Sequence, residues 1–218
     1  GDLQITTQAN VTNSGTLYAT GLQTLTVPSN LQNNGSIVSE GDSVISANSL
    51  NSSQNSSIST QGNLDIQLQS DFFPQGKILA SKKLNLSTTG VFNNQLDLTT
   101  PGNFSITAQD VNNDGSLGSG SSVNIQANRA ITNTGKIVAP SVTLSAGAQI
   151  RNTGPSALIG ATDAAGNLTL LAPTIENSDD IATTDSPPST TILGLGSVTL
   201  AGALDANNNV TKANTIIN

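Results

Sequence analysis

Carboxylates are the only side chains in this sequence with an obvious capacity for catalysis. The 218 residues include no histidine and no cysteine, which excludes serine-hydrolase triads, cysteine nucleophiles and ordinary zinc sites within them. Paired carboxylates remain, and polysaccharide hydrolases use such pairs for acid–base chemistry. Most acids are isolated, however. Asp2, Asp42, Asp65 and Asp97 alternate with apolar residues, so we expect them to face solvent.

Two groups of acids are less isolated. Asp110 and Asp114 flank a Val-Asn-Asn turn. The second group lies in a segment where the repeat described below is interrupted: Glu176, Asp179, Asp180 and Asp185. We assign ligand contacts to Asp179, Asp180 and Asp185, with calcium as an alternative ligand. Their spacing matches no EF-hand loop, so a solvated acidic loop is the plainer interpretation, and we predict no metal, no cofactor and no catalytic residue.

The elements that carry these acids belong to an internal repeat of about 20 residues. In residues 1–20, apolar residues recur at every second position, and an Asn-Ser-Gly step separates them into two groups. This alternation is typical of β-strands, and no segment has the i, i+3, i+4 pattern of an amphipathic helix. Each unit is too small to bury its apolar face alone, so successive copies must stack. The sequence therefore predicts an all-β, right-handed parallel β-helix of about ten coils.

The repeat also predicts which side chains face inward and which form the corners. The predicted inward residues include Leu3, Ile5, Leu64, Ile66, Val123 and Ile125. Asn and Gly tolerate a left-handed backbone, which suits the Asn-x-Gly step to a sharp corner. Stacked coils would place the recurring asparagines in a hydrogen-bonded ladder: Asn13, Asn33, Asn94, Asn113, Asn133, Asn152 and Asn177. Coils without this asparagine should be irregular. Pro74 replaces it in the fourth coil, and an Asn-Ser run interrupts the third.

The regularity of the repeat divides the chain into two parts. Residues 1–139 form regular coils, whereas residues 140–218 continue the β-helix with loop insertions at 155–165 and 178–195. Extra residues on a rigid scaffold commonly form its interaction surface, so we expect ligand contacts in the insertions. Arg129 and Arg151 lie in different coils, and no partner for either is evident.

Composition argues against several classes of partner. The formal charge is −7, from seven basic and fourteen acidic residues, and only 2% of residues are aromatic. Nucleic-acid binding is therefore not expected, because it needs a basic surface and stacking side chains. No apolar run reaches the length of about 18 residues that a transmembrane helix needs. The first residues lack the charged and apolar regions of a signal peptide, so we expect an interior piece of a longer protein.

The repeat unit resembles a known one. The pattern Gly-x-Leu-x-Ile, then Val-x-Asn-x-Gly-x-Ile-x-Ala, is clearest at residues 1–19 and 121–139, and it is similar to the haemagglutinin repeat of two-partner-secreted exoproteins. That group includes filamentous haemagglutinins, adhesins and contact-dependent growth inhibition effectors. The resemblance implies export as an unfolded chain through an outer-membrane two-partner secretion transporter. Folding would follow outside the cell, into a monomeric rod on the bacterial surface.

The resemblance implies a mechanical function and not an enzymatic one. We expect a stalk or adhesin segment of a secreted filament, which projects a distal binding or toxin domain and can contact a host or bacterial receptor or glycan through its loops. The alternatives are a carbohydrate-active β-helix enzyme and a phage tailspike-like polysaccharide-binding protein. A cluster of acids on one face across adjacent coils would favour the enzyme.

Overall fold

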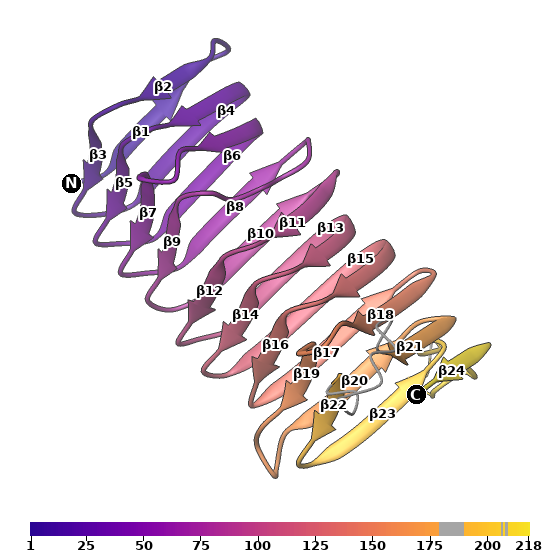
Figure 1. Ribbon diagram of the computed structural model, residues 1–218. Coiled ribbons are helices and arrows are strands. Elements are labelled where there is room, and N and C mark those ends of the chain that lie inside the picture. Colours follow the sequence, from indigo (N-terminus) through magenta and orange to yellow (C-terminus); the bar gives the residue numbers. More distant parts are fainter. Residues whose placement is uncertain (179–189, 206, 208) are drawn as a thin grey trace.

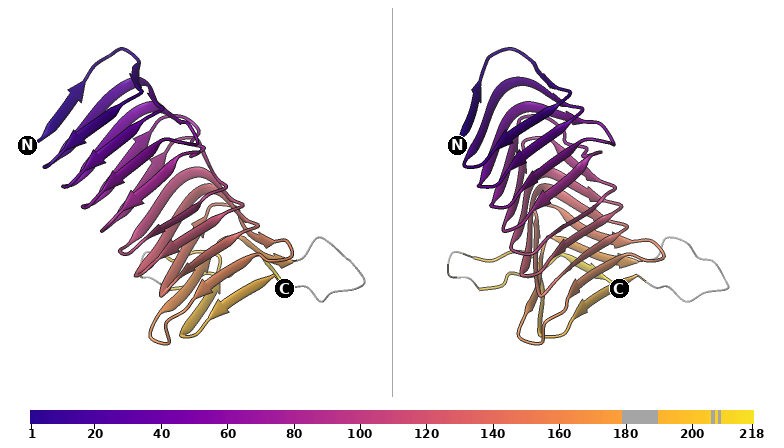
Figure 2. Two further views of the ribbon diagram at one scale, coloured as in Figure 1. Left: turned by 60° about the vertical axis from the view of Figure 1, so that its left-hand side comes forward. Right: turned by 90° about the vertical axis from the view of Figure 1, so that its left-hand side faces the viewer.

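The computed structural model describes residues 1–178, 190–205, 207 and 209–218. Within these residues, 24 β-strands stack into an elongated solenoid and no helix is present (Figure 1). All strand pairs within the sheets are parallel, as in Leu64, Leu84 and Phe104, which align in three successive coils. Figure 2 shows the first coils at one end of the stack and the last coils at the other. The prediction of an all-β parallel β-helix is confirmed.

The strands form three faces along the stack. The first face runs through β1 (Leu3–Thr6), β4 (Gln23–Asn33), β6 (Ser43–Ser52), β8 (Leu64–Leu68), β10 (Leu84–Thr88), β13 (Phe104–Asn113), β15 (Ser122–Asn133), β17 (Ser141–Ala146), β20 (Asn167–Leu171) and β23 (Ser197–Ala201). The second face combines the later halves of β4, β6, β13 and β15 with β2 (Val11–Asn13), β11 (Val91–Asn94), β18 (Gln149–Thr153), β21 (Thr174–Ser178) and β24 (Thr215–Ile217).

The third face consists of two separate sheets. The first sheet holds β3 (Thr16–Ala19), β5 (Ser36–Ser39), β7 (Ser57–Thr60) and β9 (Lys77–Ala80). The second holds β12 (Asp97–Thr100), β14 (Ser116–Ser119), β16 (Lys136–Ala139), β19 (Leu158–Ala161) and β22 (Thr191–Gly194). The stack amounts to about eight turns, slightly fewer than the ten coils predicted. The first coil has a strand on every face (β1, β2 and β3), whereas the last has only β23 and β24 among the described residues.

The core is one continuous apolar column inside the three faces. Leu64, Ile66 and Ile125 are fully buried and Val123 is 1% exposed, as the alternation predicts. Leu3 and Ile5 are only half-buried, because the first coil has a neighbour on one side alone. The pairing of β13 with β15 shifts by one residue between Ala108 and Asp110. Inside the described ranges, no helical segment has the length and hydropathy needed to cross a membrane.

Candidate functional site

Asparagine side chains form a column along the corner between the second and third faces. The side-chain amide of each donates a hydrogen bond to the side-chain oxygen of the asparagine in the next coil, with N···O distances from 2.7 to 2.9 Å. The bonded residues are Asn13 with Asn33, and, in series, Asn94, Asn113, Asn133, Asn152 and Asn177. A further member, Asn218, accepts a bond of 2.8 Å from Asn177. Asn218 was not predicted, because it lies 41 positions after Asn177, about twice the repeat period.

The same amides also bind the backbone. Asn133 is fully buried, and its Nδ2 donates to the carbonyl oxygens of Gly135 at 3.0 Å and Leu158 at 3.2 Å. Leu158 begins the third-face strand of the next coil. The amides of five other ladder residues bind the equivalent carbonyl of the next coil in the same way: Asn13, Asn33, Asn94, Asn113 and Asn152. The corners stack closely. A Cβ on Gly135 would lie 1.9 Å from the carbonyl oxygen of Gly115, so only glycine fits there.

The ladder is interrupted in the third and fourth coils. Ser52 pairs with Asn33, and Pro74 follows Phe72 at the spacing at which Asn94 follows Phe92. The third face breaks at the same level, between β9 and β12. In the regular pattern, the ladder asparagine of the fourth coil would donate its side-chain amide to the backbone of β12. Pro74 occupies that position and has no side-chain amide.

Both arginines are paired through the stack, so the expectation that neither has a partner is wrong. Arg129 donates from Nε to Oδ1 of Asp110 at 2.9 Å, and its Nη2 contacts the other carboxylate oxygen. Arg151 Nε lies 3.3 Å from the Glu176 carboxylate. Parallel stacking brings residues about one coil apart in sequence into contact. Asp114 has a separate partner, since its Oδ1 accepts a hydrogen bond of 2.8 Å from the Thr134 hydroxyl.

The Asp110 ion pair should make stability depend on pH. Hydrogen bonding from Arg129 lowers the pKa of Asp110 below its ordinary value, although burial opposes the shift. A carboxylate with a lowered pKa stabilises the fold above its unfolded pKa of about 3.9, and this contribution is lost as the pH falls through the lower, folded value. We expect the urea midpoint of the unsubstituted chain to fall further than that of Asp110→Asn between about pH 7 and pH 3. Parallel decreases would show that the ion pair contributes nothing.

The second acidic group is only partly described. Asp179, Asp180 and Asp185 lie outside the described residues. Glu176 accepts hydrogen bonds from Gln149 at 3.1 Å and Ser178 at 2.6 Å, in addition to its contact with Arg151. In the part of the chain that the structure describes, no three acidic side chains gather in a way that could hold a metal ion.

Each of the two predicted insertions, at 155–165 and 178–195, contains a short strand. Residues 158–161 form β19, which pairs with β16, and residues 191–194 form β22, which pairs with β19. The extra residues lie on either side of β19 and between β21 and β22. The sequence did not reveal these strands, because each is short and extra residues displace it from the regular spacing.

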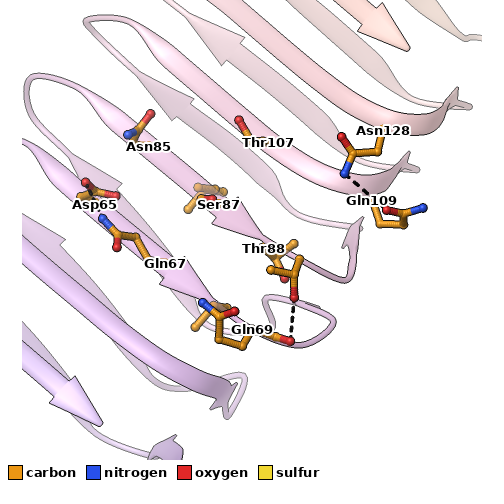
Figure 3. A pocket seen from close by; sticks show the side chains of 12 residues that line it. Asp65, Gln67, Gln69, Asn85, Ser87, Thr88, Thr107, Gln109 and Asn128 are labelled. Atoms are coloured by element: carbon orange, nitrogen blue, oxygen red, sulfur yellow. Dashed lines mark hydrogen bonds between the residues drawn. The ribbon is translucent and has the colours of Figure 1, made fainter. Parts of the chain in front are cut away.

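The outer side of the first face carries a shallow groove of about 660 Å³ (Figure 3). Carboxamides and hydroxyls from β8, β10, β13 and β15 dominate its lining, among them Gln67, Asn85, Gln109 and Asn128. Asp65 is the one acid in the lining. Its Oδ2 accepts a 3.2 Å hydrogen bond from Gln67, whereas its buried Oδ1 has no partner among the described residues. The groove therefore lacks the acid pair that glycoside hydrolysis needs. The contacts predicted from the sequence lie in the insertions, and no residue type in the sequence marks this groove.

Comparison with known proteins agrees with the repeat. A haemagglutinin repeat family model matches residues 1–67, 61–115, 102–172 and 174–218. The chain is 55% identical over 65 residues to toxin CdiA of Yersinia pestis, which is 30% of this chain and 2% of that protein. It is 36% identical over 155 residues to tRNA nuclease CdiA-2 of Burkholderia pseudomallei (strain 1026b), which is 70% of this chain and 5% of that protein.

The chain thus spans a small fraction of these relatives. No solved structure matches it. Successive matches to the family model cover nearly every coil, including the coils that lack the ladder asparagine. The chain belongs to the haemagglutinin repeat family.

Proposed function

We propose that this chain is a stalk segment of a secreted bacterial surface filament, which holds a distal binding or toxin domain away from the cell. The main support for this proposal is the continuous stack, in which one apolar column and an axial amide ladder join coil to coil. Such a solenoid needs only contacts between neighbouring coils to extend. A stalk must keep a fixed length, and distances between spin labels at different heights of the stack test this directly.

Export through an outer-membrane two-partner secretion transporter is part of the same proposal. Family membership supports this partner and a location at the cell surface. The absence of cysteine suits this route, because the chain needs no disulfide to fold once it is outside. The names of the two relatives denote a toxin and a tRNA nuclease, and we assign those activities to the parts of those proteins that this chain does not cover.

We also propose that this chain itself contacts a receptor or glycan. The acids Asp179, Asp180 and Asp185 lie in the longest departure from the repeat, and extra residues on a rigid rod are suited to binding. The groove on the first face is a second surface suited to glycan, since its carboxamides and hydroxyls both donate and accept hydrogen bonds. A carbohydrate-active enzyme is less well supported, because the groove holds a single carboxylate.

Deletion of residues 179–189 separates binding from folding. The deletion joins Ser178 to Thr190, so Asn177 precedes Thr191 by the same spacing at which Asn133 precedes Lys136 in a regular coil. Thr190→Gly would supply the corner glycine. Solenoid stability is nearly a sum of the contributions of single coils and of neighbouring pairs, so the melting temperature should change little. Binding to cells or glycan should be lost, because the proposed contact residues are removed.

The matched control is Thr190→Gly with residues 179–189 retained, which should bind like the unsubstituted chain. It loses the 2.7 Å hydrogen bond from the Thr190 hydroxyl to the Gly154 carbonyl, so its melting temperature is the reference for the deletion variant. Full binding by the deletion variant would move the contact site elsewhere, with the groove as the next candidate. A large drop in melting temperature would show that the deleted residues support the fold.

A further inference from the structure

The corner between β4 and β5 contains the one Asn-Gly dipeptide of the sequence, Asn34-Gly35. Asn34 is exposed, and it lies directly after the ladder residue Asn33. In such a dipeptide the backbone nitrogen of glycine can attack the asparagine side chain, because glycine has no Cβ to obstruct ring closure. Whether a folded chain permits this reaction depends on the hydrogen bonds around the corner.

The backbone nitrogen of Gly35 is available for attack. Its N–H makes no hydrogen bond within the described part of the chain, whereas the equivalent N–H groups of Gly115 and Gly135 donate to carbonyl oxygens of the previous coil at 3.2 and 3.1 Å. The residues on either side of Gly35 do bind the previous coil through their backbone N–H groups. Asn34 donates its own N–H to the Asn13 carbonyl at 2.8 Å, and Ser36 donates to the Gly15 carbonyl at 2.8 Å.

The side-chain amide of Asn34, which would be attacked, already accepts a hydrogen bond. Gln32 donates from Nε2 to Oδ1 of Asn34 at 2.8 Å. When a nucleophile adds to the Asn34 side chain, negative charge develops on this oxygen, and a donor already aimed at it stabilises that charge. We propose that Asn34 is a site of spontaneous deamidation in the folded chain, with Gly35 nitrogen as nucleophile and Gln32 as a positioning and activating residue.

The reaction balances without an oxidant or cofactor. The Gly35 nitrogen loses its proton and bonds to Cγ of Asn34, the Cγ–Nδ2 bond breaks, and Nδ2 leaves as ammonia. Water then opens the cyclic imide at either carbonyl, which yields an aspartate or an isoaspartate at position 34. Each product adds one negative charge at an exposed corner, and the isoaspartate also lengthens the backbone beside Asn33.

Incubation of the folded 218-residue chain at mildly alkaline pH, followed by peptide mass spectrometry and an ammonia assay, tests this inference. Residue 34 should convert to aspartate and isoaspartate with release of an equal amount of ammonia, while Asn133 in the same molecules keeps its amide. Asn34→Gln should abolish the conversion, because its longer side chain forms the ring much more slowly. Persistence of the Asn34 amide for as long as that of Asn133 would overturn the proposal.

A second variant tests the assigned role of Gln32. Gln32→Leu should slow the loss of the Asn34 amide several-fold in the folded chain, with circular dichroism confirming an unchanged fold. In urea, where the geometry is lost, the two chains should react at equal rates. Equal rates in the folded state would refute activation by Gln32.

Discussion

Phe92→Ala is expected to lower the free energy of unfolding by about 3 to 5 kcal/mol, the usual cost of emptying a large buried aromatic position. Phe92 is 1% exposed, and its ring centroid lies 5.9 Å from that of Phe72 in the coil below. Phe72 lies in the fourth coil, which lacks the ladder asparagine, and Phe92 lies in the fifth, so the two rings pack across the level at which the third face breaks. Packing must join the two halves of the stack at this level, because fewer hydrogen bonds are available there.

The measurement is urea denaturation followed by circular dichroism. Phe73→Ala is the matched control, since Phe73 has the same side chain in the neighbouring coil but is 41% exposed. Its loss should be within about 0.5 kcal/mol, as for most surface substitutions. Equal losses for the two variants would mean that the aromatic pair does not join the halves.

Asn133→Ala is expected to lower the free energy of unfolding by about 1 to 3 kcal/mol, because it leaves buried partners unsatisfied. The substitution removes donors to Asn152 and to the carbonyls of Gly135 and Leu158, and it removes the acceptor of Asn113. No water can replace these bonds without entering a fully buried corner.

Two asparagines serve as controls for this effect. Asn124 lies on the same strand but is exposed, and Asn209 lies near the end of the chain, where its side-chain bond to Asp205 is exposed. Alanine at either position should cost much less than at Asn133. If all three variants lost the same stability in urea, the ladder would not stabilise the fold.

Most of the fold could be predicted because one period governs it. Alternation at spacing two determines which residues face inward, and Leu64, Ile66, Val123 and Ile125 are buried accordingly. The ladder positions follow from the same period.

Features that depend on departures from the period could not be predicted in this way. Arg129 lies 19 residues after Asp110, beside a register shift at Ala108–Asp110, so a fixed period of 20 residues does not align the two. β19 and β22 escaped notice because extra residues displace each of them from the regular spacing. The groove is formed by polar residues that repeat like any solvent-facing column, so no residue type marks it.

The distance between spin labels along one outward column tests the central claim that this chain is a rigid rod. Because the sequence has no cysteine, two introduced cysteines are the only labelled sites. Thr24, Asn124 and Thr199 lie on one column of the first face, with Asn124 five and Thr199 eight register steps from Thr24. At about 4.8 Å per step, backbone separations of roughly 24 and 38 Å are expected, each with a narrow distribution. A broad distribution, or a separation that does not increase with the number of steps, would contradict the rod and the stalk function with it.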